Sequence, residues 1–141
     1  MNQSIKLSDF PSTSWDKIRY ADTDRQGHVN NAVFATYLET GRVNIIYGDN
    51  LDPEEAEISF VIASLQIDFR AEIHWPGKVE IGTGITKIGR TSLQLYQGIF
   101  QNDQLVAEAK TVIVQVSNAT KKSLPIDDQS REILGAFMMD R

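Results

Sequence analysis

The chain has 141 residues, the length of one domain, and its 41% hydrophobic and 23% charged residues are typical of a packed globular protein. A formal net charge of -5 argues against a nucleic-acid partner but still allows a local basic site for one phosphorylated ligand. The absence of cysteine excludes disulfides, thiolate catalysis and zinc–thiolate sites. No segment has the apolar run of a signal peptide or a membrane span, so we expect a cytoplasmic protein without a membrane partner.

The N-terminal third begins with weak structural signals. Residues 1–13 are polar, contain Pro11 and are expected to form a loose arm of a single domain that covers residues 1–141. The run WDKIRY, residues 15–20, predicts a short strand. A polar, turn-rich run over residues 21–31 follows it.

A helix is predicted next, over about residues 31–47, because apolar residues recur there at three- to four-residue spacing. Asn30 or Asn31 can cap its start, and Gly48 can end it. Gly41 lies in the interior, where glycine costs about 1 kcal/mol relative to alanine. We expect a close approach of the helix to a sheet to compensate for that cost.

Four strand-like runs complete the chain. Their alternating or apolar patterns cover residues 61–70, 78–88, 91–100 and 105–116. Short turn signals separate the runs, including Asn102-Asp103 between the last two, and a short C-terminal helix can follow. Five strands and one apolar helix predict an α+β layer architecture. The first strand should form an exposed edge, and the uncovered face needs further cover, so we expect oligomerisation.

The polar run from Asp22 to Asn31 is the densest cluster of groups that could carry out chemistry. It lies where a strand ends and the helix begins, and a helix N-terminus presents unpaired N–H groups that can polarise a carbonyl and stabilise an oxyanion. A carboxylate just upstream could reach the reacting carbon or an attacking water, and Gly27 allows a sharp turn. The same residue types are also common in ordinary turns and helix caps, so composition alone leaves both interpretations open.

Other kinds of site have weaker support in the sequence. The two histidines, His28 and His74, are too few for a zinc site on their own, so no metal is expected. The chain has no G-x-S-x-G elbow, no P-loop and no G-x-G-x-x-G motif. Lys87 and Arg90 flank one turn, and lysines follow the last strand, so these groups could neutralise phosphates or could be ordinary surface residues.

Two segments resemble a known family. The run IRYADTDRQGHVNNAVFATYLETGR, Ile18 to Arg42, resembles the opening motif of the 4-hydroxybenzoyl-CoA thioesterase-like group of hotdog-fold proteins and the D-x-D-x-x-x-H-V-N-N stretch of plant fatty-acyl-ACP thioesterases. The run ITKIGRTSLQ, Ile85 to Gln94, is similar to a turn between two central strands of that group. The resemblance covers about residues 14–134. It implies a hotdog fold, a five-stranded antiparallel sheet wrapped around one long central helix, in a homodimer or homotetramer with active sites at the dimer interface.

The resemblance also implies roles for individual residues. Asp24 matches the catalytic carboxylate, which acts as nucleophile or as general base on water. Asn31 matches the helix-start position whose backbone N–H binds the thioester carbonyl, and His28 matches a histidine that assists the reaction. Some bacterial relatives carry a histidine at the position of Asn31. Glu39 and Arg42 match common helix positions, for which we favour a structural or interface role.

Coenzyme A contacts are implied at a second set of residues. Arg90, with Ser92 nearby, matches the turn that meets the CoA nucleotide, and Lys121 and Lys122 lie near another basic position that meets it. No separate cofactor is expected, because coenzyme A would be part of the substrate.

The predicted reaction is hydrolysis of an acyl-CoA to a carboxylic acid and CoA. Hydrolysis of acyl-ACP is a variant of this prediction, in which the basic turn would meet an acidic carrier protein. Hydration or dehydration of an acyl thioester is less favoured, because those hotdog enzymes show D-x-N-P-x-H, whereas His28 follows Asp24 by four positions without a proline between them. A non-catalytic acyl-thioester binder remains an alternative, since a fold does not guarantee activity.

Overall fold

The computed structural model describes residues 4–47 and 52–141. Five antiparallel strands form one sheet in the order β1-β3-β4-β5-β2. The elements are the 3₁₀ turns η1 (Leu7–Asp9) and η2 (Tyr20–Asp22), strands β1 (Ser12–Lys17), β2 (Ile58–Phe69), β3 (Lys78–Ile88), β4 (Ser92–Gln101) and β5 (Gln104–Ser117), and helices α1 (Val33–Ile46) and α2 (Asp128–Gly135). The α+β architecture with one long helix against a five-stranded antiparallel sheet is confirmed.

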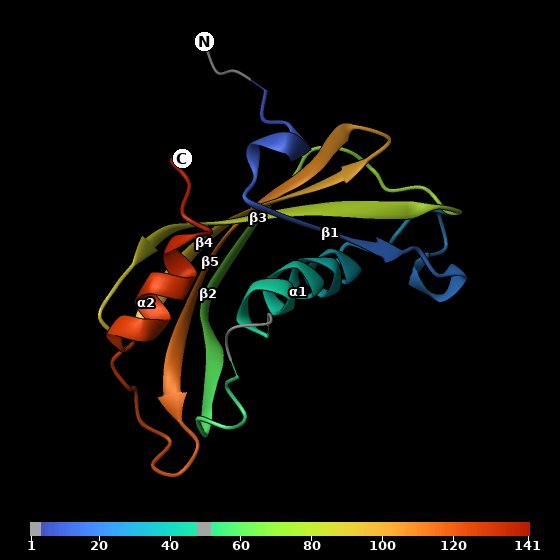
Figure 1. Ribbon diagram of the computed structural model, residues 1–141. Helices are drawn as coiled ribbons and strands as arrows, with labels where there is room; N and C mark the ends of the chain where they lie inside the picture. Colours follow the sequence, from blue (N-terminus) through green and yellow to red (C-terminus); the bar gives the residue numbers. More distant parts are fainter. Residues whose placement is uncertain (1–3, 48–51) are drawn as a thin grey trace.

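Helix α1 lies across one face of the sheet, which bends around it (Figure 1). The predicted face of the helix is buried, at Phe34, Tyr37, Leu38, Gly41 and Ile45. The expected close approach at Gly41 is also confirmed, because a Cβ there would meet side chains of β3 and β4 at less than 3 Å. Helix α2 closes the far end of the same layer, where its Leu134 packs with Ile45.

The opposite face of the sheet is covered by both ends of the chain (Figure 1). Ile5 and Phe10 are buried there, and the Phe10 ring stacks on Tyr96 with the centroids 5.5 Å apart. The expectation of a loose arm is therefore wrong for the described residues 4–13. The physical reason lies partly in β3 and β4, where Gly82 and Gly98 lack side chains at the place that the Phe10 ring occupies.

Strand β1 also differs from its prediction. It runs over Ser12–Lys17, three residues earlier than expected, and pairs with β3 from Ser12↔Thr83 to Lys17↔Lys78. The prediction placed the aromatic residues Trp15 and Tyr20 at the ends of the strand. Both side chains are exposed, and Tyr20 belongs to η2.

The edges of the sheet are β1, as predicted, and β2. Strand β2 pairs on one side only, with β5, and leaves Val61, Ile62 and Phe69 about half exposed. The predicted turn at Asn102-Asp103 and the C-terminal helix are confirmed. The expected helix end at Gly48 lies outside the described residues. No helix within 4–47 and 52–141 is long and apolar enough to cross a membrane.

Candidate active site

Asp24 lies at the start of a tight hairpin between η2 and α1. Thr23 and Val29 form a bridge, and within it the Asp24 N–H donates to the His28 carbonyl (2.9 Å). The Gly27 N–H donates to the Asp24 carbonyl (3.1 Å), and Gly27 adopts a positive φ of 87° that other residues rarely adopt. The predicted sharp turn at this glycine is thus confirmed.

The Asp24 carboxylate is held at one oxygen, and its side chain is partly exposed. Its Oδ1 accepts a hydrogen bond from the Gln26 N–H (2.9 Å), and its Oδ2 lies 3.8 Å from His28 Nδ1. The side chain is 29% exposed, so a substrate or water can reach it. A carboxylate fixed through one oxygen can act as a base or nucleophile through the second.

His28 lies between two carboxylates, one of which the sequence did not point to. Its Nδ1 faces Asp24, and its Nε2 lies 3.5 Å from Oε1 of Glu72, whose other oxygen lies 3.8 Å from His74 Nε2. His28 and His74 are opposite each other in an isolated antiparallel bridge. The local sequence around Glu72 does not reveal its contact with His28, because that contact depends on how the loop of residues 70–77 packs against the hairpin. Among the described residues, no group of three or more side chains is arranged to hold a metal ion.

One backbone N–H just before α1 is available for a carbonyl site. The expected side-chain cap at Asn30 or Asn31 is wrong, because the N-cap position is Ala32 and has no side-chain cap hydrogen bond. Asn30 instead forms a turn before the helix, in which its Oδ1 accepts from the Ala32 N–H and its carbonyl accepts from the Val33 N–H (both 2.9 Å). Asn31 is exposed, and no residue in the described part of the chain accepts a hydrogen bond from its backbone N–H. This N–H is therefore free to meet a ligand oxygen.

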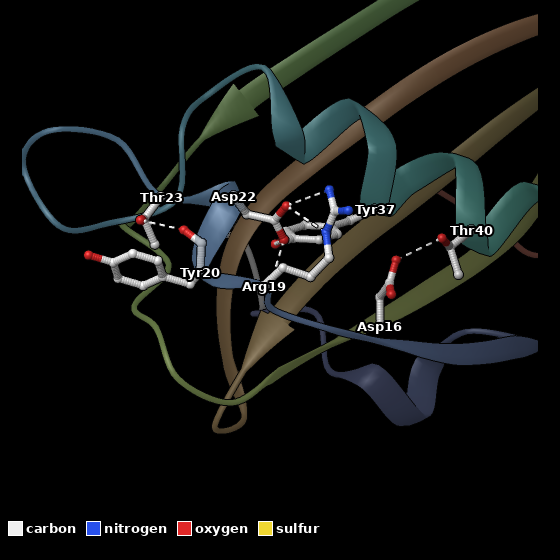
Figure 2. A network of polar contacts seen from close by, with 7 residues as sticks. All are labelled: Asp16, Arg19, Tyr20, Asp22, Thr23, Tyr37 and Thr40. Atoms are coloured by element: carbon white, nitrogen blue, oxygen red, sulfur yellow. Dashed lines mark hydrogen bonds and ion pairs between the residues drawn. The ribbon is translucent and has the colours of Figure 1, made fainter.

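A buried carboxylate, Asp22, joins the base of the hairpin to α1 (Figure 2). Its oxygens accept from the Arg19 N–H (2.9 Å), from Arg19 Nε (3.1 Å) and Nη2 (2.9 Å), and from the Tyr37 hydroxyl (2.8 Å). Burial would raise the pKa of Asp22, but hydrogen bonds from the Arg19 N–H, the Tyr37 hydroxyl and the guanidinium outweigh it and hold the pKa below its ordinary value. Burial, together with the bond to Asp22, raises the pKa of Tyr37.

The residues implied in CoA binding lie in two loops beside the end of β5. The Gln115 N–H donates to the Thr91 carbonyl (2.8 Å), and the Ser117 N–H donates to the Lys122 carbonyl (2.9 Å), so both loops meet the end of β5. Arg90, Lys121 and Lys122 are exposed there, and Ser92 is half-buried.

This basic end is remote from Asp24 within one protomer. The hairpin of Asp24 is bonded to residues just before β3, through Val29 N–H and the Ile73 carbonyl (2.9 Å), whereas Arg90 follows the end of β3. Since β3 has 11 residues, its length of about 35 Å separates the two groups. The structure thus brings Asp24 and His28 together, leaves Asn31 in the same polar segment just before α1, and places the CoA candidates at the opposite end.

A curved antiparallel sheet around one long helix, with a polar hairpin at the helix start, defines the hotdog class of proteins. The chain belongs to the thioesterase-like superfamily, whose family model matches residues 18–134, and it is a thioester hydrolase.

Individual relatives agree with this assignment. A Helicobacter pylori protein named acyl-CoA thioesterase YbgC is 32% identical over 130 residues, covering 86% of this chain and 98% of its own length. A Thermus thermophilus thioesterase solved with coenzyme A and Zn is 30% identical, with a TM-score of 0.78 over 92% of this chain and 95% of its own. A predicted thioesterase from Bacillus stearothermophilus is 29% identical, with a TM-score of 0.83 over 92% and 98% of the two chains.

Proposed function

We propose that this protein hydrolyses acyl-CoA thioesters to a free carboxylic acid and CoA, with Asp24 as general base or nucleophile. The observation that carries the proposal is the Asp24 carboxylate, which is fixed at Oδ1, is partly exposed and lies in the same polar segment as Asn31, whose backbone N–H has no acceptor among the described residues. The activity in the name of the Helicobacter relative and the coenzyme A bound by the Thermus relative support the same substrate class.

In the general-base route, the thioester carbonyl oxygen accepts from the Asn31 N–H while a water attacks the carbon and gives its proton to Asp24. The tetrahedral oxyanion then collapses, the C–S bond breaks, and the CoA thiolate leaves and takes up the proton. In the nucleophilic route, Asp24 attacks directly, the thiolate leaves, and water hydrolyses the resulting anhydride. His28, between Asp24 and Glu72, is placed to assist either route.

We further propose that the active sites are completed by a second protomer. Strand β2 offers a free edge with exposed apolar residues. If the β2 strands of two protomers pair antiparallel, the C-terminal end of β2 in one protomer lies beside the N-terminal end of β2 in its partner. The C-terminal end is the one near the Asp24 hairpin. The N-terminal end lies beside the end of β5, since Ile58 pairs with Ser117, and hence beside the basic loops. Such a dimer joins Asp24 of one protomer to Arg90 of its partner.

An apolar groove next to this edge fits the acyl group. It lies between α1 and strands β2 and β5, with a volume of about 180 Å³; Glu39 and Arg42 line one part of it, and the rest of its lining is apolar, at Val43, Ile46, Tyr47, Phe60, Ile62 and Ile113. In the proposed dimer the partner strand would cover this groove, so that an acyl chain would be shielded from water.

The first experiment measures thiol release from short, long, branched and aromatic acyl-CoAs by the wild type, Asp24→Asn and a matched control, Asp128→Asn. The amide of Asn can still accept from the Gln26 N–H, so the hairpin should persist, and the control removes the same charge on exposed α2. We expect release by the wild type and the control, with a loss of about 100-fold or more in Asp24→Asn. Equal rates in Asp24→Asn and wild type would refute the role of Asp24.

A second experiment tests the shared site by complementation. Asp24→Asn and Arg90→Ala protomers are each defective, but a mixed dimer contains one site with both native residues if the two come from different protomers. Random mixing should then restore about a quarter of the wild-type rate at substrate concentrations below KM. If Asp24 and Arg90 act within one protomer, no intact site forms and mixing restores nothing.

Two alternatives are separated by the same assays. If no acyl-CoA releases thiol but acyl-ACP does, the substrate is an acyl carrier protein thioester. If acyl-CoA and acyl-ACP bind without thiol release, the protein is a non-catalytic acyl-thioester binder. The cytoplasmic location stays a prediction.

A further inference from the structure

Asp22 makes two contacts that hold the hairpin, one to α1 and one across the base of the hairpin. Its carboxylate accepts from the hydroxyl of Tyr37, a 2% exposed residue of α1, at 2.8 Å. Its backbone carbonyl accepts from the Asn30 N–H (2.9 Å) across the base of the hairpin. Asp22 therefore connects the segment that enters the hairpin both to the middle of α1 and to Asn30, which precedes α1.

These bonds determine where Asp24 lies relative to the helix start. Asp24 is two residues beyond Asp22, and the hairpin is otherwise held to the sheet through Val29 and the His28–His74 bridge. Those contacts connect the second half of the hairpin, at His28 and Val29, to residues 73–74. The Tyr37–Asp22 bond connects the residues just before the hairpin to α1. Without the bond, the hairpin could shift relative to α1 while keeping its internal hydrogen bonds.

We propose that Asp22 and Tyr37 are positioning residues for thioester hydrolysis, because their hydrogen bond holds the Asp24 carboxylate and the Asn31 N–H around one carbonyl carbon. This inference rests on the proposed function. A displacement of about 1 Å between reacting groups can lower a rate about 100-fold, so a bond that touches no substrate can still matter for turnover.

The same helix contains a matched contact that does not reach the hairpin. Thr40 lies three residues after Tyr37 and donates to Asp16 Oδ2 on β1 at 2.9 Å (Figure 2). Both bonds join a hydroxyl of α1 to a carboxylate of the N-terminal segment. If such bonds only stabilise the fold, Tyr37→Phe and Thr40→Val should have similar consequences; if the hairpin is positioned as proposed, only Tyr37→Phe should slow the reaction.

The test compares the wild type, Asp24→Asn, Tyr37→Phe and Thr40→Val in thiol release and in amide hydrogen exchange of the hairpin. We expect Tyr37→Phe to lower kcat about tenfold or more with KM within about twofold, and Thr40→Val to leave both within about twofold. Exchange of the Asp24 and Gly27 N–H groups should accelerate in Tyr37→Phe only. Asp22→Ala, which leaves the Arg19 guanidinium without its carboxylate, should add little further loss of kcat to Tyr37→Phe, because both changes remove the Tyr37–Asp22 bond.

The outcomes separate the two proposals. Normal kcat and unchanged hairpin exchange in Tyr37→Phe would overturn the positioning role while leaving the proposed function intact. A slowed Tyr37→Phe with equally slowed Thr40→Val would also overturn it, because the effect would then be general. If wild type and Asp24→Asn prove equally inactive, the proposed function fails, and exchange alone decides whether the bond holds the hairpin.

Discussion

Gly41→Ala is expected to destabilise the protein, although alanine is the better helix former. A Cβ at this position would lie 2.6 Å from Thr83 Oγ1, 2.7 Å from Ile81 Cγ2 and 2.8 Å from Gln97 Nε2. These atoms cannot move away easily, since Gln97 Nε2 donates to the Leu38 carbonyl (2.9 Å) and to Thr83 Oγ1 (3.0 Å). Overpacking of this kind costs about 1–3 kcal/mol or more, against a gain of about 1 kcal/mol in helix propensity. Because the added Cβ would clash with three atoms, we expect the free energy of unfolding to fall by about 2 kcal/mol.

Gly135→Ala is the matched control for this prediction, because Gly135 is also helical and its added Cβ would meet nothing within 4 Å. Urea unfolding at one fixed protein concentration should show a lower free energy of unfolding for Gly41→Ala and an unchanged or slightly higher one for Gly135→Ala. In thermal unfolding, 2 kcal/mol corresponds to about 6–8 °C in a domain of this size. A Gly41→Ala variant as stable as Gly135→Ala would refute the argument that close packing requires the glycine.

Three further changes test other parts of the structure. Tyr96→Phe removes a 2.6 Å hydrogen bond to Glu108 and should cost about 1.5–3 kcal/mol at pH 7 in urea unfolding. Because this bond holds the pKa of Glu108 below its ordinary value of 4.5, its contribution is present above that pH, and the cost should shrink as the pH falls through the lowered pKa; a cost that is constant down to pH 3 would contradict this. Glu72→Gln removes the charge beside His28 and should reduce kcat several-fold with little loss of stability, and an unchanged kcat would argue against a role for Glu72. Gly27→Ala forces a positive φ on alanine and should cost about 1–2 kcal/mol and slow thiol release, whereas asparagine at the same position should be tolerated better.

Sequence patterns predicted the parts of the fold in which local periodicity and burial agree. The helix face follows from apolar spacing, the close approach at Gly41 follows from the cost of a glycine inside a helix, and the helix begins at Val33 within two residues of the expected start. The first strand and the N-terminal arm could not be placed, because their burial depends on distant partners. Phe10 is buried partly because two glycines of β3 and β4 leave space for its ring, and these are more than 70 residues away in the sequence.

The candidate site shows the same limit at the level of single residues. Asp24, His28 and Asn31 are close in sequence, so a family motif could identify them together. Glu72 reaches His28 only through the fold, and the separation of Asp24 from Arg90 is a property of the sheet that no local motif contains.

The different roles of Asp22 and Asp24 also depend on the fold. The two residues are separated only by Thr23, and composition alone does not indicate which carboxylate should react. Asp22 is 2% exposed and accepts four hydrogen bonds from Arg19 and Tyr37, which stabilise its charge and leave it a poor base or nucleophile. Asp24 accepts one backbone hydrogen bond, is accessible, and keeps Oδ2 towards His28. Asp22 ends the 3₁₀ turn η2 and meets Tyr37 of α1, whereas Asp24 lies in the hairpin beside His28, so the first carboxylate can hold the second in place.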